Sequence, residues 1–152
     1  MKLIGFGGTR VVYELNDDIV LKVPKRDQKE AGHKQNENEY DIYVRTKAPM
    51  LAEVKGWMET EHGLGLLMER LQPIDWIDES FINFLEVQRK GIRAYVTEEQ
   101  LRQFAIQNEL SFHELLFTIN WGVTKDGVLK LFDYGRTLEV CELEISRRIF
   151  KK

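Results

Sequence analysis

The chain has 152 residues, of which 43% are apolar and 31% charged, a composition typical of one globular domain with a sizeable core. Its 22 Lys and Arg against 25 Asp and Glu give a net charge of −3, which argues against binding nucleic acid or an acidic membrane through bulk charge. A single cysteine excludes an internal disulfide, and no apolar run is long enough for a signal sequence or membrane span, so we expect a cytoplasmic protein, a host cell's cytoplasm included.

The first predicted elements are a β-hairpin and a helix. Residues 11–23 contain two β-branched runs on either side of Asn16-Asp17-Asp18, a pattern that predicts two strands and a turn. Residues 34–47 are polar and helix-tolerant and end before Ala48-Pro49. The spacing of the larger apolar residues in this segment predicts a buried stripe made of Tyr40, Tyr43 and Val44.

A second hairpin and a change of pattern follow. Residues 51–58 and 64–71 are short apolar runs separated by a polar, glycine-containing turn, which predicts two more strands. After Pro73 the pattern becomes helical, and one helix is expected across Trp76, Phe81, Phe84 and Leu85. We therefore place a boundary between two lobes at about residues 71–73.

The last predicted elements are a capped helix and a third hairpin. Thr97-Glu98-Glu99-Gln100 matches a capping box and marks a helix start. Residues 121–124 and 128–132 flank Lys125-Asp126-Gly127, and Asp-Gly between apolar runs is a strong hairpin signal. The fold class expected from these elements is α+β.

Two N-terminal segments resemble motifs of protein kinases. Gly5, Gly7 and Gly8 precede a strand, as in the glycine-rich loop whose backbone amides approach nucleotide phosphates, and Arg10 stands where the family has its third glycine. On the following strand Val20 and Lys22 point to one face, like the Val and Lys of the family's V-A-I-K strand. The residues alone also permit an ordinary turn and a solvent-facing lysine on an edge strand.

Two further segments extend this resemblance. The family holds its lysine with a glutamate on the next helix, and Glu39 matches that position better than Glu37 because the apolar residues that follow it have the family spacing. The segment from Asn120 to Gly135 is similar to the kinase pattern N-I-L-x-x-x-x-G-x-x-K-L-x-D-F-G, with Asp133 as the aspartate of D-x-G. An ordinary Asp-Gly hairpin would explain the turn but not the register of the other residues.

The resemblance implies a protein-kinase-like bilobal fold. Residues 1–71 would form a β-rich N-lobe, and residues 72–152 a truncated, mainly helical C-lobe that carries a β-hairpin. ATP would bind in the cleft between them, at a hinge near Glu69 to Leu71 with Met68 close to it. Asn120 and Asp133 would be the magnesium ligands. Besides the glycines, the positions expected to contact the nucleotide are Val12, Val20, Lys22, Glu39, Met68, Glu69 and Leu71.

The sequence departs from the kinase pattern where catalysis would occur. The position of the catalytic aspartate holds Leu115, which has no lone pair to accept a hydroxyl proton, and the lysine two places later is Phe117. Glu114 is a candidate substitute for the aspartate. The C-lobe is also expected to be far smaller than usual, with only a short tail after Gly135 and without the segments that hold a protein substrate.

Three hypotheses about function follow from this pattern. The first is a pseudokinase, similar to compact kinase-like proteins of phages and bacterial effectors, that binds ATP and magnesium and acts by binding another protein. The second is a Ser/Thr kinase of low turnover. The third is an interaction module that no longer binds nucleotide because Arg10 occupies the phosphate space.

Overall fold

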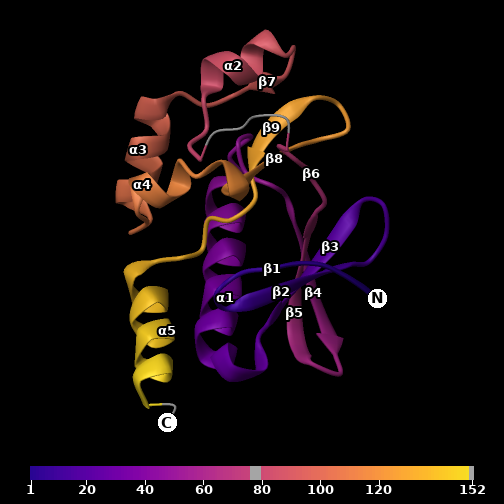
Figure 1. The fold of residues 1–152 in the computed structure, drawn as a ribbon, viewed down its shortest axis with the longest axis vertical. Coiled ribbons are helices and arrows are strands. Elements are labelled where there is room, and N and C mark those ends of the chain that lie inside the picture. The colour runs from indigo at the N-terminus through magenta and orange to yellow at the C-terminus, as the bar shows by residue number, and fades with distance from the viewer. Residues whose placement is uncertain (76–79, 151–152) are drawn as a thin grey trace.

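Five antiparallel strands form the larger of two sheets in the computed structural model, which describes residues 1–75 and 80–150 (Figure 1). Their order across the sheet is β1-β2-β3-β5-β4. The strands are β1 (Lys2–Phe6), β2 (Arg10–Glu14), β3 (Ile19–Pro24), β4 (Val54–Thr60) and β5 (Gly63–Glu69). Both predicted hairpins in this half are confirmed, and the first turn forms because Asn16 Oδ1 accepts hydrogen bonds from the backbone N–H groups of Asp18 and Ile19.

Helix α1 (Lys29–Thr46) follows β3 through a short 3₁₀ turn, η1 (Arg26–Gln28), and packs against the sheet. It begins five residues before the predicted start and ends where expected, with Lys47 in the left-handed conformation. The predicted buried stripe is wrong at Val44, which is 49% exposed, while Tyr40 and Tyr43 are half-buried. The residues that α1 buries are largely polar because this face meets charged groups of the sheet: Ala31, Gly32, Gln35, Asn36, Glu39 and Ile42.

The second sheet has the strand order β6-β8-β9-β7. Its members are β6 (Gln72–Pro73), β7 (Arg93–Ala94), β8 (Trp121–Val123) and β9 (Val128–Leu131). The predicted hairpin of residues 121–132 is confirmed as β8 and β9, with Gly127 at the positive φ that its turn requires. The sequence pattern did not reveal β6 and β7, which are two residues long and extend the hairpin into a four-stranded sheet.

Three short helices surround this second sheet: α2 (Phe84–Arg89), α3 (Glu98–Gln107) and α4 (Phe112–Leu115). The capping box at Thr97 is confirmed at the start of α3. The helix predicted across residues 76–85 is wrong in its extent, because α2 begins at Phe84 after an Asn83 cap and Phe81 instead forms an isolated bridge with Phe117. Its predicted residue Trp76 lies outside the described residues.

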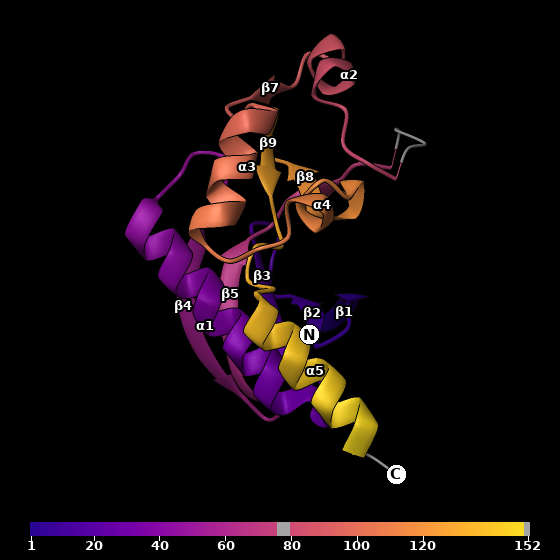
Figure 2. The same ribbon diagram turned by 90° about the vertical axis from the view of Figure 1, so that its left-hand side faces the viewer.

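One continuous apolar cluster connects the two sheets, so the molecule is a mixed α+β structure built around a shared core. The backbone at Ala52 and Leu131 joins them directly, since the Ala52 N–H donates to the Leu131 carbonyl at 2.9 Å. Helix α5 (Leu138–Phe150), which the sequence pattern did not predict, lies alongside α1 (Figure 2). Across residues 1–75 and 80–150 we find no helix with the length and hydropathy needed to cross a bilayer.

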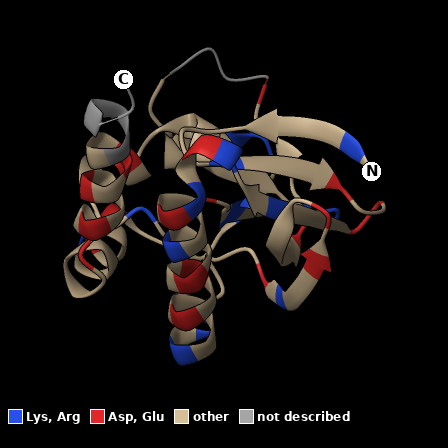
Figure 3. Ribbon diagram, turned by 90° about the horizontal axis from the view of Figure 1, so that it is seen from below, with Lys and Arg blue, Asp and Glu red and all other residues tan. Residues whose placement is uncertain are grey.

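Charged residues of both signs are interspersed along the ribbon in the view of Figure 3. Those coloured on α5 are acidic, whereas α1 carries both signs. Most pairs on the surface are of the weak, solvent-screened kind, for example Lys55 with Glu53. The exceptions are charged side chains that are buried where β2, β3 and α1 meet.

Candidate functional site

A cavity of about 730 Å³ lies between the first sheet and the segment from Leu110 to Arg136. It contains most of the positions that the sequence singled out: Gly5, Gly7, Gly8, Val12, Val20, Lys22, Leu71, Asn120 and Asp133. Arg10, Glu114 and Leu115 also line it, whereas Phe117 does not. Segments far apart in the chain therefore meet at one concave surface of ordinary ligand-site size.

The glycine-rich segment forms the tight turn between β1 and β2. The Gly7 N–H donates to the Arg10 carbonyl at 2.8 Å, which closes the turn. At Gly8 an added Cβ would lie 2.5 Å from Glu144 Oε1, so a side chain there would require the Glu144 carboxylate to move. Glycine at position 8 thus allows the turn to lie directly against the Glu144 side chain of α5.

Lys22 and Glu39 form an ion pair between β3 and α1. Lys22 Nζ lies 3.0 Å from Glu39 Oε1 and donates to the Phe132 carbonyl at 2.6 Å, and the Phe132 ring centroid is 3.9 Å away. Both side chains are almost completely buried. Glu37, the alternative partner, is instead 46% exposed beside His33.

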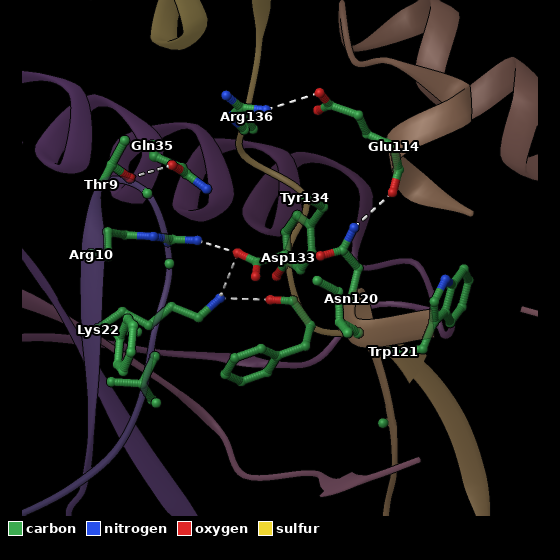
Figure 4. Close-up of a pocket in the computed structure, with 18 of the residues that line it drawn as sticks. Thr9, Arg10, Lys22, Gln35, Glu114, Asn120, Trp121, Asp133, Tyr134 and Arg136 are labelled. Carbon is green, nitrogen blue, oxygen red and sulfur yellow. Dashed lines mark hydrogen bonds and ion pairs between the residues drawn. The ribbon is translucent and has the colours of Figure 1, made fainter. Parts of the chain in front are cut away.

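Arg10 joins this pair to Asp133. Its guanidinium holds Glu39 through two hydrogen bonds of 2.6 and 3.1 Å, and its Nη2 also donates to Asp133 Oδ1. Lys22 Nζ is 3.7 Å from the same Asp133 oxygen. We call Arg10, Lys22, Glu39 and Asp133 the charged cluster; Figure 4 shows Arg10 and Lys22 both extending toward Asp133.

Burial and mutual attraction set the pKa values in the charged cluster. Burial and the positive charge of Arg10 together lower the pKa of Lys22 by more than Glu39 and Asp133 raise it. Burial also opposes the charge on Arg10, but Glu39 and Asp133 outweigh it and the pKa of Arg10 is raised. For Asp133 burial raises the pKa, yet Lys22 and Arg10 overcome this and hold it below its usual value, so the carboxylate is ionised at neutral pH.

The predicted magnesium ligands lie at the cavity, but their surroundings do not fit the ion. The carboxylate of Asp133 is already paired with Arg10 and Lys22, two cations of the chain. The Asn120 side chain donates to the Glu114 carbonyl at 2.7 Å. Magnesium usually keeps several waters and binds through one or two carboxylates together with substrate phosphates, so the Asp133 carboxylate would have to leave both cations before it could hold the ion.

Of the three predicted contacts at the hinge, Leu71 lines the cavity, whereas Met68 and Glu69 do not. Met68 is fully buried in the apolar core, and the Glu69 carboxylate accepts from Lys130 Nζ at 2.8 Å, so neither side chain faces the cavity. The backbone N–H groups of Glu69 and Arg70 donate to carbonyls of the chain. Leu71 is the predicted hinge residue that lines the cavity.

The residues aligned with the kinase catalytic loop form an apolar wall. Leu115 is 4% exposed, and its carbonyl accepts from Trp121 Nε1 at 2.7 Å. The ring of Phe117 stacks on Phe81 at 5.2 Å, away from the cavity. Glu114, the candidate substitute for the missing aspartate, is paired with Arg136 at 2.9 Å (Figure 4).

Sequence reasoning missed Arg136, one of three arginines that line the cavity in the described part of the chain, and the helix behind it. Arg136 bridges Glu114 and Glu144, with both N–O distances at 2.9 Å, and thereby ties α5 to the end of α4. The sequence signal for α5 was a run without Gly or Pro after Thr137, and in the structure Val140 and Glu144, four residues apart, are both buried. Reading the residues after Gly135 as a short tail was therefore wrong.

The chain was also compared with known proteins. No protein-family model matches it, and no curated protein matches it either. The functional argument therefore rests on the residues and on the geometry of the cavity.

Proposed function

We propose that this chain is a protein-kinase-like nucleotide-binding protein that acts by binding another protein and does not transfer phosphate. The observation that carries the proposal is the charged cluster, in which Lys22 pairs with the buried Glu39 and approaches Asp133 at the wall of one cavity. In this interpretation the five-stranded sheet with α1 corresponds to a kinase N-lobe, residues 1–71. Residues 72–152 then correspond to a reduced C-lobe.

The cost of the charged cluster supports a ligand-binding role. Burying three ionised groups, Arg10, Lys22 and Glu39, carries a large desolvation penalty, and apolar residues of similar volume usually serve stability as well or better. Buried charge at the wall of a cavity is instead common at functional sites, where it meets a charged ligand. The cavity adds apolar side chains, Val12, Val20 and Leu71, that suit the two faces of a purine ring.

The opposite wall argues against phosphoryl transfer. Such transfer needs a group that orients or deprotonates the attacking hydroxyl, and Leu115 offers no acceptor. Glu114 is the nearest carboxylate in sequence, but Arg136 holds it at 2.9 Å. The alternative of a low-turnover kinase would require this ion pair to open.

A binding titration tests the proposal. Calorimetry with ATP and with ADP should show saturable binding to the wild type, and Lys22→Met should weaken it by about tenfold or more because the buried cation is lost. Lys55→Met, which removes an exposed lysine of β4, is the matched control and should bind like the wild type. Absence of nucleotide binding to the wild type would refute the proposal.

Labelled ATP separates binding from catalysis. Incubation of the wild type with radiolabelled ATP and generic substrates should leave both the substrates and the protein unlabelled. Label that depends on Glu114 would favour the low-turnover kinase.

A second candidate function is favoured by Arg10. Its buried guanidinium lies at the end of the cavity where the resemblance places phosphates, as an interaction module without nucleotide would require. This candidate predicts that neither ATP nor ADP binds the wild type, so the same titration decides between the two.

A further inference from the structure

Arg10 is the member of the charged cluster that the kinase resemblance does not provide. It is the first residue of β2, 5% exposed, and it lies at the position of a glycine in the family pattern. Its guanidinium contacts Asp133, the carboxylate expected to hold magnesium. We propose, resting on the proposed function, that Arg10 replaces the divalent cation at Asp133, so that this cavity binds a nucleoside phosphate without metal.

The charge balance of the cluster supports this proposal. Two cations, Arg10 and Lys22, face two carboxylates, Glu39 and Asp133, so the formal charges cancel without a metal ion. A divalent ion on Asp133 would also lie close to both cations, because each already approaches the same carboxylate oxygen. The repulsion between like charges in a partly desolvated site opposes that arrangement.

The two carboxylates differ in how readily they can release Arg10. Glu39 is fully buried and accepts from Arg10, from Lys22 and from the Tyr134 N–H, so it is fixed in place. The Asp133 side chain is 38% exposed and can exchange with an anion that enters from the cavity. A phosphate oxygen accepts from a guanidinium with the same geometry as a carboxylate, so the exchange preserves the hydrogen bond on Arg10 Nη2.

Two fully buried residues of α1, Asn36 and Glu39, set the direction from which a ligand can approach Arg10. Asn36 Oδ1 accepts from Arg10 Nη1 at 2.9 Å and, together with Glu39, fixes the guanidinium from the α1 side. The cavity side is therefore where a ligand can meet Arg10. Phosphates would then contact Arg10 and Lys22 directly, without a bridging ion.

The first test compares wild-type binding of ADP and ATP by calorimetry in excess EDTA and in excess magnesium chloride. The proposal expects equal or tighter binding in EDTA, because the metal-free phosphate is the species recognised. Binding that weakens about tenfold or more in EDTA would overturn the inference but leave the proposed function standing. Absence of binding under both conditions would overturn the two together.

The second test restores the glycine of the family pattern. Arg10→Gly should abolish binding in EDTA and make any remaining binding depend on magnesium, since Asp133 is then free to hold the ion. Arg102→Ala on the exposed face of α3 is the control and should behave as the wild type. Arg10→Gly that binds in EDTA as tightly as the wild type would contradict the proposal.

A metal titration needs no variant and no nucleotide. Manganese, followed by its paramagnetic resonance signal, should remain free in the presence of the wild-type protein. Stoichiometric manganese binding that is lost in Asp133→Asn would show that Arg10 does not occupy the cation position.

Discussion

The two walls of the cavity have opposite chemical character. One wall, at the junction of β2, β3 and α1, buries three members of the charged cluster, Arg10, Lys22 and Glu39. The other wall, formed around α4 and β8, centres on Leu115 and Trp121, both nearly inaccessible to solvent, and we call it the apolar wall although the Glu114–Arg136 ion pair also lines the cavity there. The resemblance to kinases places phosphate-contacting residues on the first wall and hydroxyl-activating residues on the second.

This difference separates binding from catalysis. The charged wall carries a desolvation cost that only pairing and hydrogen bonding offset, so each of its members depends on the others. The apolar wall is stabilised by burial and by the hydrogen bond from Trp121 to the Leu115 carbonyl, and its neighbouring carboxylate, Glu114, is paired with Arg136. Under the proposed function, the first wall would hold a ligand and the second would supply no free proton acceptor.

The largest expected effect comes from removing the charge of Glu39, which pairs with both cations of the charged cluster. Glu39→Gln removes the charge that faces Arg10 and Lys22 and should lower the free energy of unfolding by about 3–5 kcal/mol, because two buried cations lose their fixed counterion. Urea denaturation measures the change. Glu37→Gln, on the exposed side of the same helix, should change stability by less than about 0.5 kcal/mol. Equal losses in both variants would show that the cluster has no special energetic role.

A somewhat smaller effect is expected from placing a charge on the apolar wall. Leu115→Asp restores the residue type of the kinase pattern but puts a carboxyl group at a site that is 4% exposed, and should cost about 2–4 kcal/mol. Leu115→Met, which preserves volume and polarity, should cost less than about 1.5 kcal/mol. Labelled ATP should reveal no phosphoryl transfer by Leu115→Asp. Phosphoryl transfer by a stable Leu115→Asp variant would mean that the aspartate is the one residue missing from an otherwise functional catalytic site.

The apolar wall also contains a buried hydrogen bond between Trp121 and Leu115, and removing it gives a third comparison. Trp121→Phe removes the hydrogen bond from Nε1 to the Leu115 carbonyl, and the buried acceptor left behind should cost about 1–3 kcal/mol in urea denaturation. Trp57→Phe, at a half-buried tryptophan of β4, is the control and should cost less. A larger loss at Trp57 would indicate that ring packing, and not the hydrogen bond, holds this wall.

The elements that were predicted correctly are those specified by a few neighbouring residues. The Asn16 and Gly127 turns and the Thr97 capping box are determined by residues within four positions of each other, and all three are found. The strands β6 and β7, each of two residues, have no periodicity to detect and exist because they pair with β8 and β9. Helix α5 had a detectable pattern, which the expectation of a short tail obscured.

The candidate site likewise has contacts that could be predicted from the sequence and contacts that could not. The contact between Lys22 and Glu39 was expected from the resemblance to kinases, and strand alternation at Lys22 and the apolar spacing after Glu39 selected these two residues. The contact of Arg10 with Asp133 spans 123 positions and could not be inferred from spacing. The sequence could show that Arg10 replaced a glycine, but only the fold shows that its charge faces the expected metal ligand.

The smallest expected effect concerns the partly exposed member of the charged wall. The lowered pKa of Asp133 means that its ionised form contributes stability that is fully present above the ordinary aspartate pKa of about 3.9 and is lost as the pH falls through the lowered value. Because the Asp133 side chain is 38% exposed and screened by solvent, Asp133→Asn should cost on the order of 1 kcal/mol at neutral pH. Below about pH 4 the wild type should lose stability more steeply than this variant, since only the wild type has the group that titrates. Urea denaturation across the acid range measures both curves, with Asp41→Asn on the exposed face of α1 as the control. Parallel curves of unfolding free energy against pH for the wild type and Asp133→Asn would show that Arg10 and Lys22 do not depend on the Asp133 carboxylate. Glu39 would then be the carboxylate of the charged cluster that stabilises both cations.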